Sequence, residues 1–142
     1  MYKKKNIAIV WGGYSREKII SEKSAEGIDS FINKDIYNTF KVKIESNSWT
    51  VEYKNSYLPI DKNDFSFIVD EGKIVFDFVY NTIHGTPGED GLLQGYFDML
   101  GISYSSCGVL SSALTFNKYI SNNFPGTSDF RILYLTALSP HI

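Results

Sequence analysis

The stretch IAIVWGG, residues 7–13, decides the fold. Its apolar residues follow one another without interruption, as they do in a strand that is buried on both faces of a parallel sheet. The two glycines at its end, Gly12 and Gly13, are typical of a tight turn after such a strand. We therefore predict a central strand over residues 7–11 that leads through a glycine turn into the next element.

The residues after this turn have the spacing of an amphipathic helix. Apolar or small side chains recur at intervals of three and four, which places them on one helical face against a sheet. These residues are Ile20, Ser24, Ile28, Phe31 and Ile32. A strand, a glycine turn and a helix in this order are typical of an α/β fold.

The rest of the chain extends this pattern. Residues 41–76 alternate apolar and polar side chains between turn-like pairs, which predicts a β-rich insert. Residues 77–82 are apolar again and predict a further strand of the sheet, and residues 102–104 predict a short one. Helical spacing covers residues 92–100 and 109–122. We therefore expect an α/β domain with a Rossmann-like, open, mainly parallel sheet flanked by helices.

Composition narrows the function classes. The chain has 142 residues, which is a typical length for one domain. Its 14 Lys and Arg and 16 Asp and Glu residues give a net charge of -2. This balance does not favour a nucleic-acid or membrane partner. The single cysteine, Cys107, cannot form a disulfide within the chain. One cysteine and two histidines also provide too few ligands for a closed zinc site. We expect a cytoplasmic protein with no metal site of its own.

Two glycine-rich loops could carry the chemistry. The first contains Gly12 and Gly13, and the second is HGTPGEDG, residues 84–91. In an open α/β sheet, ligands gather at the carboxyl ends of the strands, where the amide groups of helix N-termini point at them. We therefore expect both loops to line one crevice.

Each candidate side chain in these loops has a functional and a structural interpretation. Glu17 could accept hydrogen bonds from an ammonium group, or it could simply favour the start of a helix. His84 could bind a carboxylate or phosphate or move a proton, or it could hold its own loop together. Glu89 could cap the helix that follows it. Lys118 could reach a phosphate, although an exposed helical lysine is the ordinary case.

The order and spacing of several motifs resemble one family, over roughly residues 5 to 122. The matching segments are GGYSRE at residues 12–17, HGTPGEDGLLQG at residues 84–95, LGISY at residues 100–104 and GVLSSALTFNK at residues 108–118. This pattern is similar to the N-terminal domain of D-alanine–D-alanine ligases, which are ATP-grasp enzymes.

The resemblance implies a function and a role for several residues. The family phosphorylates the carboxylate of one D-alanine and joins it to the amine of a second, which makes a dipeptide for bacterial peptidoglycan. By this resemblance Glu17 holds the ammonium group of the first D-alanine and Ser21 supports the turn beside it. His84 lies beside the reacting carboxylate, Glu89 supports the same subsite through the residues around it, and Lys118 contributes to the nucleotide phosphates.

The resemblance also implies what a longer chain would supply. The intact enzyme uses ATP and Mg²⁺ and is expected to be a homodimer, while the ATP-grasp regions have no counterpart in 142 residues. We expect residues 1–124 to form the substrate-binding domain. We expect residues 125–142 to be a tail that departs from the family, because of a change of reading frame or because the segment was cut at an artificial boundary. The chain alone is then expected to be inactive and to bind no nucleotide tightly. Two alternatives stay open: a stand-alone amino-acid-binding or regulatory module, and part of a D-alanine–D-lactate ligase.

Overall fold

The structure, a computed structural model, describes residues 3–117. Within this range the chain forms eight strands and three helices: β1 (Lys5–Gly12), α1 (Lys18–Phe31), β2 (Tyr37–Ile44), β3 (Trp49–Tyr53), β4 (Ser56–Pro59), β5 (Ser66–Val69), β6 (Gly72–Val75), β7 (Phe78–Asn81), α2 (Leu92–Leu100), β8 (Ser103–Tyr104) and α3 (Val109–Phe116). Lys118, the predicted continuation of the third helix to residue 122 and the predicted tail at 125–142 lie outside the described residues.

One sheet organises these elements. Its strand order is β4-β3-β2-β1-β7-β8, with β1 parallel to β2 and β7, and β7 parallel to β8. The remaining pairings, β2 with β3 and β3 with β4, are antiparallel. The predicted α/β class with a mainly parallel sheet is therefore confirmed, with the run at residues 7–11 at its centre.

The β-rich region differs from its predicted boundary at residues 41–76. Residues 41–44 belong to β2, which pairs along its full length with β1 as an ordinary parallel strand. Strands β3 and β4 then extend the same sheet, and only β5 and β6 form a separate hairpin. The sequence prediction missed β2 because just two of its residues, Val42 and Ile44, are fully buried, so its pattern lacks the continuous apolar run of β1.

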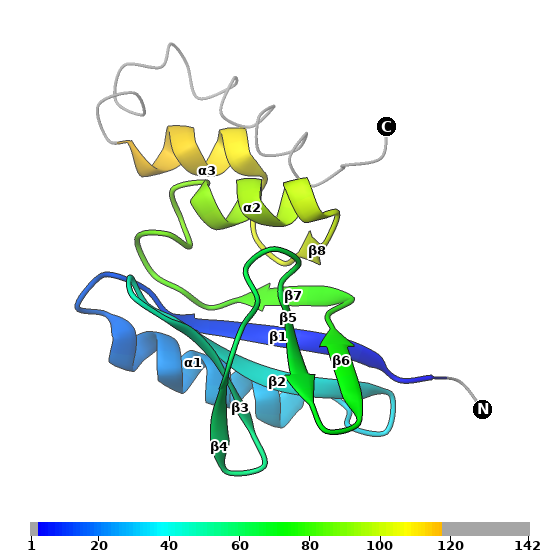
Figure 1. Cartoon of the computed structure of the whole chain (residues 1–142). Coiled ribbons are helices and arrows are strands. Elements are labelled where there is room, and N and C mark those ends of the chain that lie inside the picture. The colour runs from blue at the N-terminus through cyan, green and yellow to red at the C-terminus, as the bar shows by residue number, and fades with distance from the viewer. Residues whose placement is uncertain (1–2, 118–142) are drawn as a thin grey trace.

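The two faces of the sheet are covered by different elements. On one face Ile7, Ile9 and Trp11 pack against Ala25 of α1. On the other face Ala8 and Val10 join a larger core that includes the β5–β6 hairpin and α2. In Figure 1 the hairpin crosses the sheet on the side opposite α1, with α2 and α3 beyond β7.

The face that α1 turns to the sheet agrees only in part with the predicted one. Its fully buried residues are the small Ser21 and Ala25, whereas Ile20 and Phe31 are 54% and 88% exposed. Ile28 and Ile32 are partly buried beside them, as predicted. Small side chains allow the helix backbone to approach β1 closely, which leaves Ile20 and Phe31 on a neighbouring stripe. The helical period and two of the predicted apolar positions are therefore confirmed, while the centre of the buried face lies at Ser21 and Ala25.

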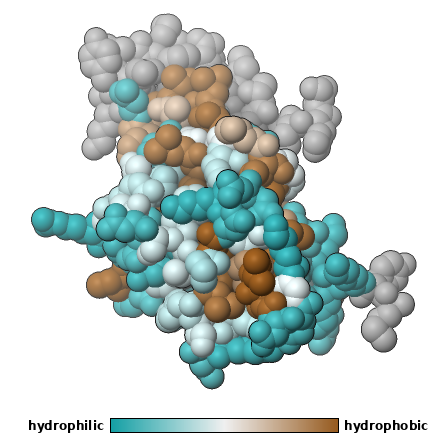
Figure 2. Space-filling model, in the orientation of Figure 1, coloured by the Kyte–Doolittle hydropathy of each residue, from teal (hydrophilic) through white to brown (hydrophobic). Residues whose placement is uncertain are grey.

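Apolar side chains are also exposed elsewhere on the molecule. On the hairpin Ile68 and Val75 are 69% and 52% exposed, and on the helices Met99 and Leu110 are 88% and 62% exposed. Figure 2 shows hydrophobic surface over the hairpin near the middle of the view, framed by hydrophilic residues. Further hydrophobic surface lies near α3 at the top of the same view. None of the helices between residues 3 and 117 has the length and hydropathy needed to cross a membrane.

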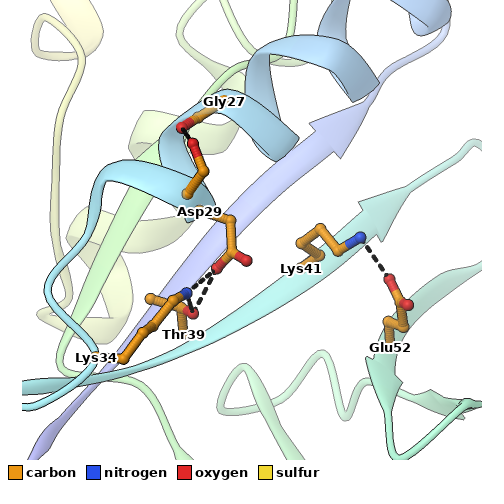
Figure 3. Close-up of polar contacts among 7 residues, drawn as sticks. Gly27, Asp29, Lys34, Thr39, Lys41 and Glu52 are labelled. Carbon is orange, nitrogen blue, oxygen red and sulfur yellow. Dashed lines mark hydrogen bonds and ion pairs between the residues drawn. The ribbon is translucent and has the colours of Figure 1, made fainter.

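A polar cluster fastens α1 to β2. Asp29 accepts hydrogen bonds from Lys34 and from Thr39 of β2, and Lys41 of the same strand lies 2.8 Å from Glu52 of β3 (Figure 3). Burial alone would raise the pKa of Asp29, but the hydrogen bonds from Lys34 and Thr39 and the charge of Lys34 outweigh it. The pKa of Asp29 therefore lies below its ordinary value of 3.8.

Asp29→Asn should show how much this cluster stabilises the domain. A carboxyl group whose pKa is lowered by folding contributes stability above its unfolded pKa and loses it as the pH falls through the folded value. Because the Asp29 side chain is 34% exposed, the loss at about pH 7 should stay below about 1 kcal/mol. The difference from the parent should shrink as the pH falls below the ordinary Asp pKa of 3.8. Urea unfolding across this range measures it, with exposed Asp35→Asn as the control expected to follow the parent at every pH.

Candidate functional site

A cleft of about 300 Å³ lies where β7 ends. Its lining includes both predicted loop residues, His84 and Glu89, together with Gly88 between them. The remaining lining residues come from α1, from the end of β7 and from the loop after β8: Ser24, Ile28, Tyr80, Asn81, Thr82, Ile83 and Ser106. The cleft therefore lies at the carboxyl end of a parallel strand, as predicted for a ligand site in this class of fold.

The two glycine-rich loops are joined directly by hydrogen bonds, but only the second one lines the cleft, and Gly12, Gly13 and Glu17 are not among its lining residues. The Tyr14 amide donates to the Thr86 carbonyl at 2.9 Å, and the Ser15 hydroxyl donates to the His84 carbonyl at 3.2 Å. Ser15 also accepts a hydrogen bond from the Glu17 amide at 3.2 Å. One hydroxyl group thus connects the backbones of the two residues for which a direct role was predicted, Glu17 and His84.

Glu17 and His84 use none of their side-chain hydrogen-bonding capacity within the described part of the chain. Glu17 is the exposed residue before α1, and its carboxylate makes no capping hydrogen bond. His84 is half-buried in the cleft, and its ring has no hydrogen-bond partner among residues 3–117. The loop-holding interpretation of the His84 ring therefore finds no side-chain contact among residues 3–117, whereas the position of Glu17 at the start of α1 still fits its structural interpretation. Neither side chain has a hydrogen-bond partner in this range that a ligand would have to displace.

Glu89 is held within its own loop. Its carboxylate accepts a hydrogen bond from the Gly85 amide at 2.6 Å, and its own amide donates to the Gly85 carbonyl at 2.9 Å. Asp90, and not Glu89, accepts a hydrogen bond from the first turn of α2, at the Leu92 amide. The capping interpretation of Glu89 is therefore replaced by a loop-closing contact at the edge of the cleft.

Ser21 lies beneath the glycine turn. Its side chain is fully buried, and its hydroxyl accepts a hydrogen bond from the Gly12 amide at 3.0 Å. The hydroxyl of Thr82 lies 3.4 Å away and donates to the Val10 carbonyl at 2.8 Å. Ser21 therefore contacts the turn and not the open cleft, so any effect on a ligand passes through the backbone of Gly12.

The turn itself requires glycine. At Gly12 a Cβ atom would lie 2.7 Å from the Ile44 carbonyl oxygen, and at Gly13 it would lie 2.6 Å from the Ile83 side chain. Both residues also have positive φ angles, 102° and 90°. This loop therefore fits closely between β2 and β7, and its glycines are explained by packing.

Two residues that the sequence analysis did not single out, Asn81 and Gln94, hold the walls of the cleft together. Asn81 donates to the Gly88 carbonyl at 2.8 Å, and Gln94 donates to the same carbonyl at 2.7 Å and to the Ser106 hydroxyl at 3.0 Å. Asn81 and Gln94 carry no charge and have no distinctive spacing, so composition and periodicity do not reveal them. Gln94 does fall in the segment at residues 84–95, which is the one signal that could have found it.

No metal centre is formed by this part of the molecule. Between residues 3 and 117 no three histidine, cysteine, aspartate or glutamate side chains gather closely enough to hold an ion. The described residues therefore do not fit a magnesium site by themselves. The groups that remain for a ligand are the His84 ring in the cleft and the exposed Glu17 carboxylate on the adjoining loop.

A family comparison identifies this arrangement. The family described as "D-ala D-ala ligase N-terminus" matches residues 6–107. The chain belongs to this family. Both loops and the cleft of this D-Ala-D-Ala ligase N-terminal domain fall within the matched range, and the predicted resemblance is confirmed.

Individual relatives agree with this assignment. A D-alanine--D-alanine ligase of Parabacteroides distasonis is 60% identical over 122 residues, which are 85% of this chain and 37% of that protein. The crystal structure of D-alanyl-alanine synthetase A from Vibrio cholerae has a TM-score of 0.75 at 32% identity, covering 86% of this chain and 37% of the other. A D-alanine--D-alanine ligase from Bacillus anthracis complexed with ATP has a TM-score of 0.62 at 27% identity, covering 85% and 34%. The chain thus spans a little over a third of the length of these proteins.

Proposed function

We propose that this domain is the N-terminal, substrate-binding part of an ATP-dependent ligase that joins two D-alanines into D-alanyl-D-alanine for peptidoglycan. The observation that carries the proposal is the cleft at the end of β7. Its lining residues all lie within the segment that matches the family, and they include His84, whose ring has no hydrogen-bond partner among residues 3–117. The printed name of the closely similar relative, D-alanine--D-alanine ligase, supplies the substrate.

The proposed roles follow from the chemistry of the groups. The Glu17 carboxylate, exposed and uncapped, holds the ammonium group of the first D-alanine by charge-assisted hydrogen bonds. The His84 ring lies beside the carboxylate of the same molecule and stabilises the charge that develops there. Glu89 keeps the loop closed around this subsite, and Ser21 holds the Gly12 turn beside it.

Other parts of the intact enzyme complete the reaction in this proposal. ATP supplies the phosphoryl group that activates the carboxylate, and Lys118, which lies outside the described residues, contacts its phosphates. The Mg²⁺ ligands are assigned to the ATP-grasp regions, because residues 3–117 do not form a metal cluster. A second copy of the chain is the further partner that we propose, in the cytoplasm, where the lone Cys107 stays reduced.

Calorimetric titration of the 142-residue chain tests the substrate assignment. D-alanine should release or absorb heat with a one-to-one stoichiometry, and L-alanine at the same concentrations should bind more weakly. Equal binding of the two enantiomers would favour a general amino-acid-binding module. If neither amino acid binds, the proposed subsite is wrong for this chain.

Glu17→Gln should weaken the binding of D-alanine more than tenfold. The substitution keeps the shape of the side chain but removes the charge that faces the ammonium group, which costs about 1.5 to 3 kcal/mol. The matched control is Glu22→Gln, which removes an exposed carboxylate one turn further along α1. If Glu17→Gln and Glu22→Gln bind D-alanine as the parent does, Glu17 is only a residue at the start of a helix.

A further inference from the structure

The side chain of Gln94 joins the loop after β7 to the loop after β8. It is 1% exposed on α2, and its amide nitrogen donates to the Gly88 carbonyl at 2.7 Å and to the Ser106 hydroxyl at 3.0 Å. Gly88 belongs to the loop after β7 and Ser106 to the loop after β8, and both line the cleft. One buried side chain therefore sets the separation of two of its walls.

The carbonyl group of Gly88 is the central point of this connection. It also accepts a hydrogen bond from Asn81 at 2.8 Å, so two side-chain amides hold one oxygen atom. The Gly88 amide in turn donates to the Gly85 carbonyl at 2.8 Å, beside the bond that Glu89 makes to the same group. The position of Gly88 is thus transmitted directly to the segment that contains His84 and Glu89.

The oxygen atom of the same side chain shows that stability does not explain a glutamine here. Oε1 of Gln94 is buried and has no hydrogen-bond partner in the described part of the chain. A reversed amide would place this oxygen against the Gly88 carbonyl, so the orientation is fixed by the partners. An apolar side chain of the same length would avoid the cost of a buried unpaired acceptor. The two donated bonds, and not packing, are therefore what the glutamine supplies.

We propose that Gln94 is a positioning residue that fixes the shape of the D-alanine subsite by holding Gly88 and Ser106 together. The proposal rests on the proposed function for its ligand. Loss of the two hydrogen bonds that Gln94 donates should then alter the cleft while the fold stays intact. Gly88 keeps its hydrogen bond from Asn81, and the half-buried Ser106 hydroxyl can bind water instead.

Gln94→Met separates the two effects. Methionine has a similar length and fills irregular apolar space, so the urea midpoint of the variant should equal or exceed that of the parent. Hydrogen exchange at the Gly88 and Glu89 amides should become faster by about tenfold or more, while exchange at Val10 in β1 stays unchanged. Binding of D-alanine should weaken by about tenfold or more.

A second variant keeps the test decisive if Gln94→Met does not fold. Ser106→Ala removes one partner of Gln94 at a half-buried position, and it should weaken D-alanine binding without lowering the urea midpoint. If Ser106→Ala binds D-alanine as the parent does, the hydrogen bond between Gln94 and Ser106 does not shape the subsite and the proposal is wrong. Where Gln94→Met folds, the two effects should not add in the double variant, because both act through the same connection, and fully additive effects would overturn that connection.

The outcomes distinguish this proposal from the function on which it rests. If the parent chain does not bind D-alanine, the proposed function fails, and exchange at Gly88 and Glu89 alone decides whether Gln94 positions the loop. If exchange is unchanged in Gln94→Met, the positioning role is overturned whatever the ligand. If exchange becomes faster but D-alanine binding is unchanged, Gln94 orders the loop without shaping the subsite, and the proposal is wrong.

Discussion

Phe65→Ala should lower the free energy of unfolding by about 3 to 5 kcal/mol. The Phe65 ring is fully buried and contacts four other rings, with centroid distances of 4.9 Å to Phe97, 5.1 Å to Phe76, 6.0 Å to Tyr96 and 6.1 Å to Trp49. These rings come from β3, from α2 and from the segment between β6 and β7. Removing the Phe65 ring therefore leaves a cavity where several elements meet.

Urea unfolding followed by circular dichroism measures this loss. For a domain with a typical stability of about 5 to 15 kcal/mol, the variant should unfold at a much lower urea concentration. Tyr57→Ala is the matched control, because this aromatic side chain in β4 is 64% exposed and should change the stability by no more than about 0.5 kcal/mol. Similar midpoints for the two variants would show that the Phe65 ring contributes little to the core.

Gly88→Ala should disrupt the cleft and lower stability by about 1 to 3 kcal/mol or more. A Cβ atom at this position would lie 2.6 Å from Cβ of Ile83 and 2.7 Å from its carbonyl oxygen. These two atoms belong to the backbone of Ile83 or are bonded directly to it, so a rotation of the side chain cannot move them away. The loop must shift instead, and with it Glu89 and His84, so binding of D-alanine should be lost.

Gly27→Ala provides the contrast for this experiment. Gly27 lies in α1, and a Cβ atom there would meet nothing within 4 Å. Alanine favours a helix over glycine by about 0.5 to 1 kcal/mol, so this variant should be more stable than the parent and should bind D-alanine normally. If Gly88→Ala behaves like Gly27→Ala in unfolding and in titration, the close contact at Ile83 does not constrain the loop.

The parts of the fold that follow from sequence are those with a continuous apolar signal. Ile7 to Trp11 predicted the central strand, and the loop that begins at His84 predicted one wall of the site. Strand β2 was missed because its outward side chains, such as Lys41 and Lys43, interrupt the pattern although its backbone is central. The exposed stripe of α1 shows the same limit, since Phe31 has the right period but the small Ala25 is the residue that reaches the sheet.

The site could be predicted only where charge or glycine marked it. Glu17, His84 and Glu89 were found as candidates, because ionisable groups beside glycine-rich turns suggest chemistry. Gln94 and Ser106 are 12 residues apart in sequence, and their hydrogen bond depends on how β7, α2 and β8 pack. Such contacts leave no periodic pattern in a single sequence.

The position of β1 between β2 and β7 also has a consequence for synthesis of the chain. Asn6 is 32 residues from its contact Asn38 on one side, but 71 residues from its contact Asp77 on the other. During translation, α1 and β2 can therefore assemble with β1 early, while the opposite edge of β1 stays unpaired until the hairpin and β7 have left the ribosome. Because contacts so distant in sequence form slowly, this edge is the part of the nascent domain most open to wrong pairing and to chaperones.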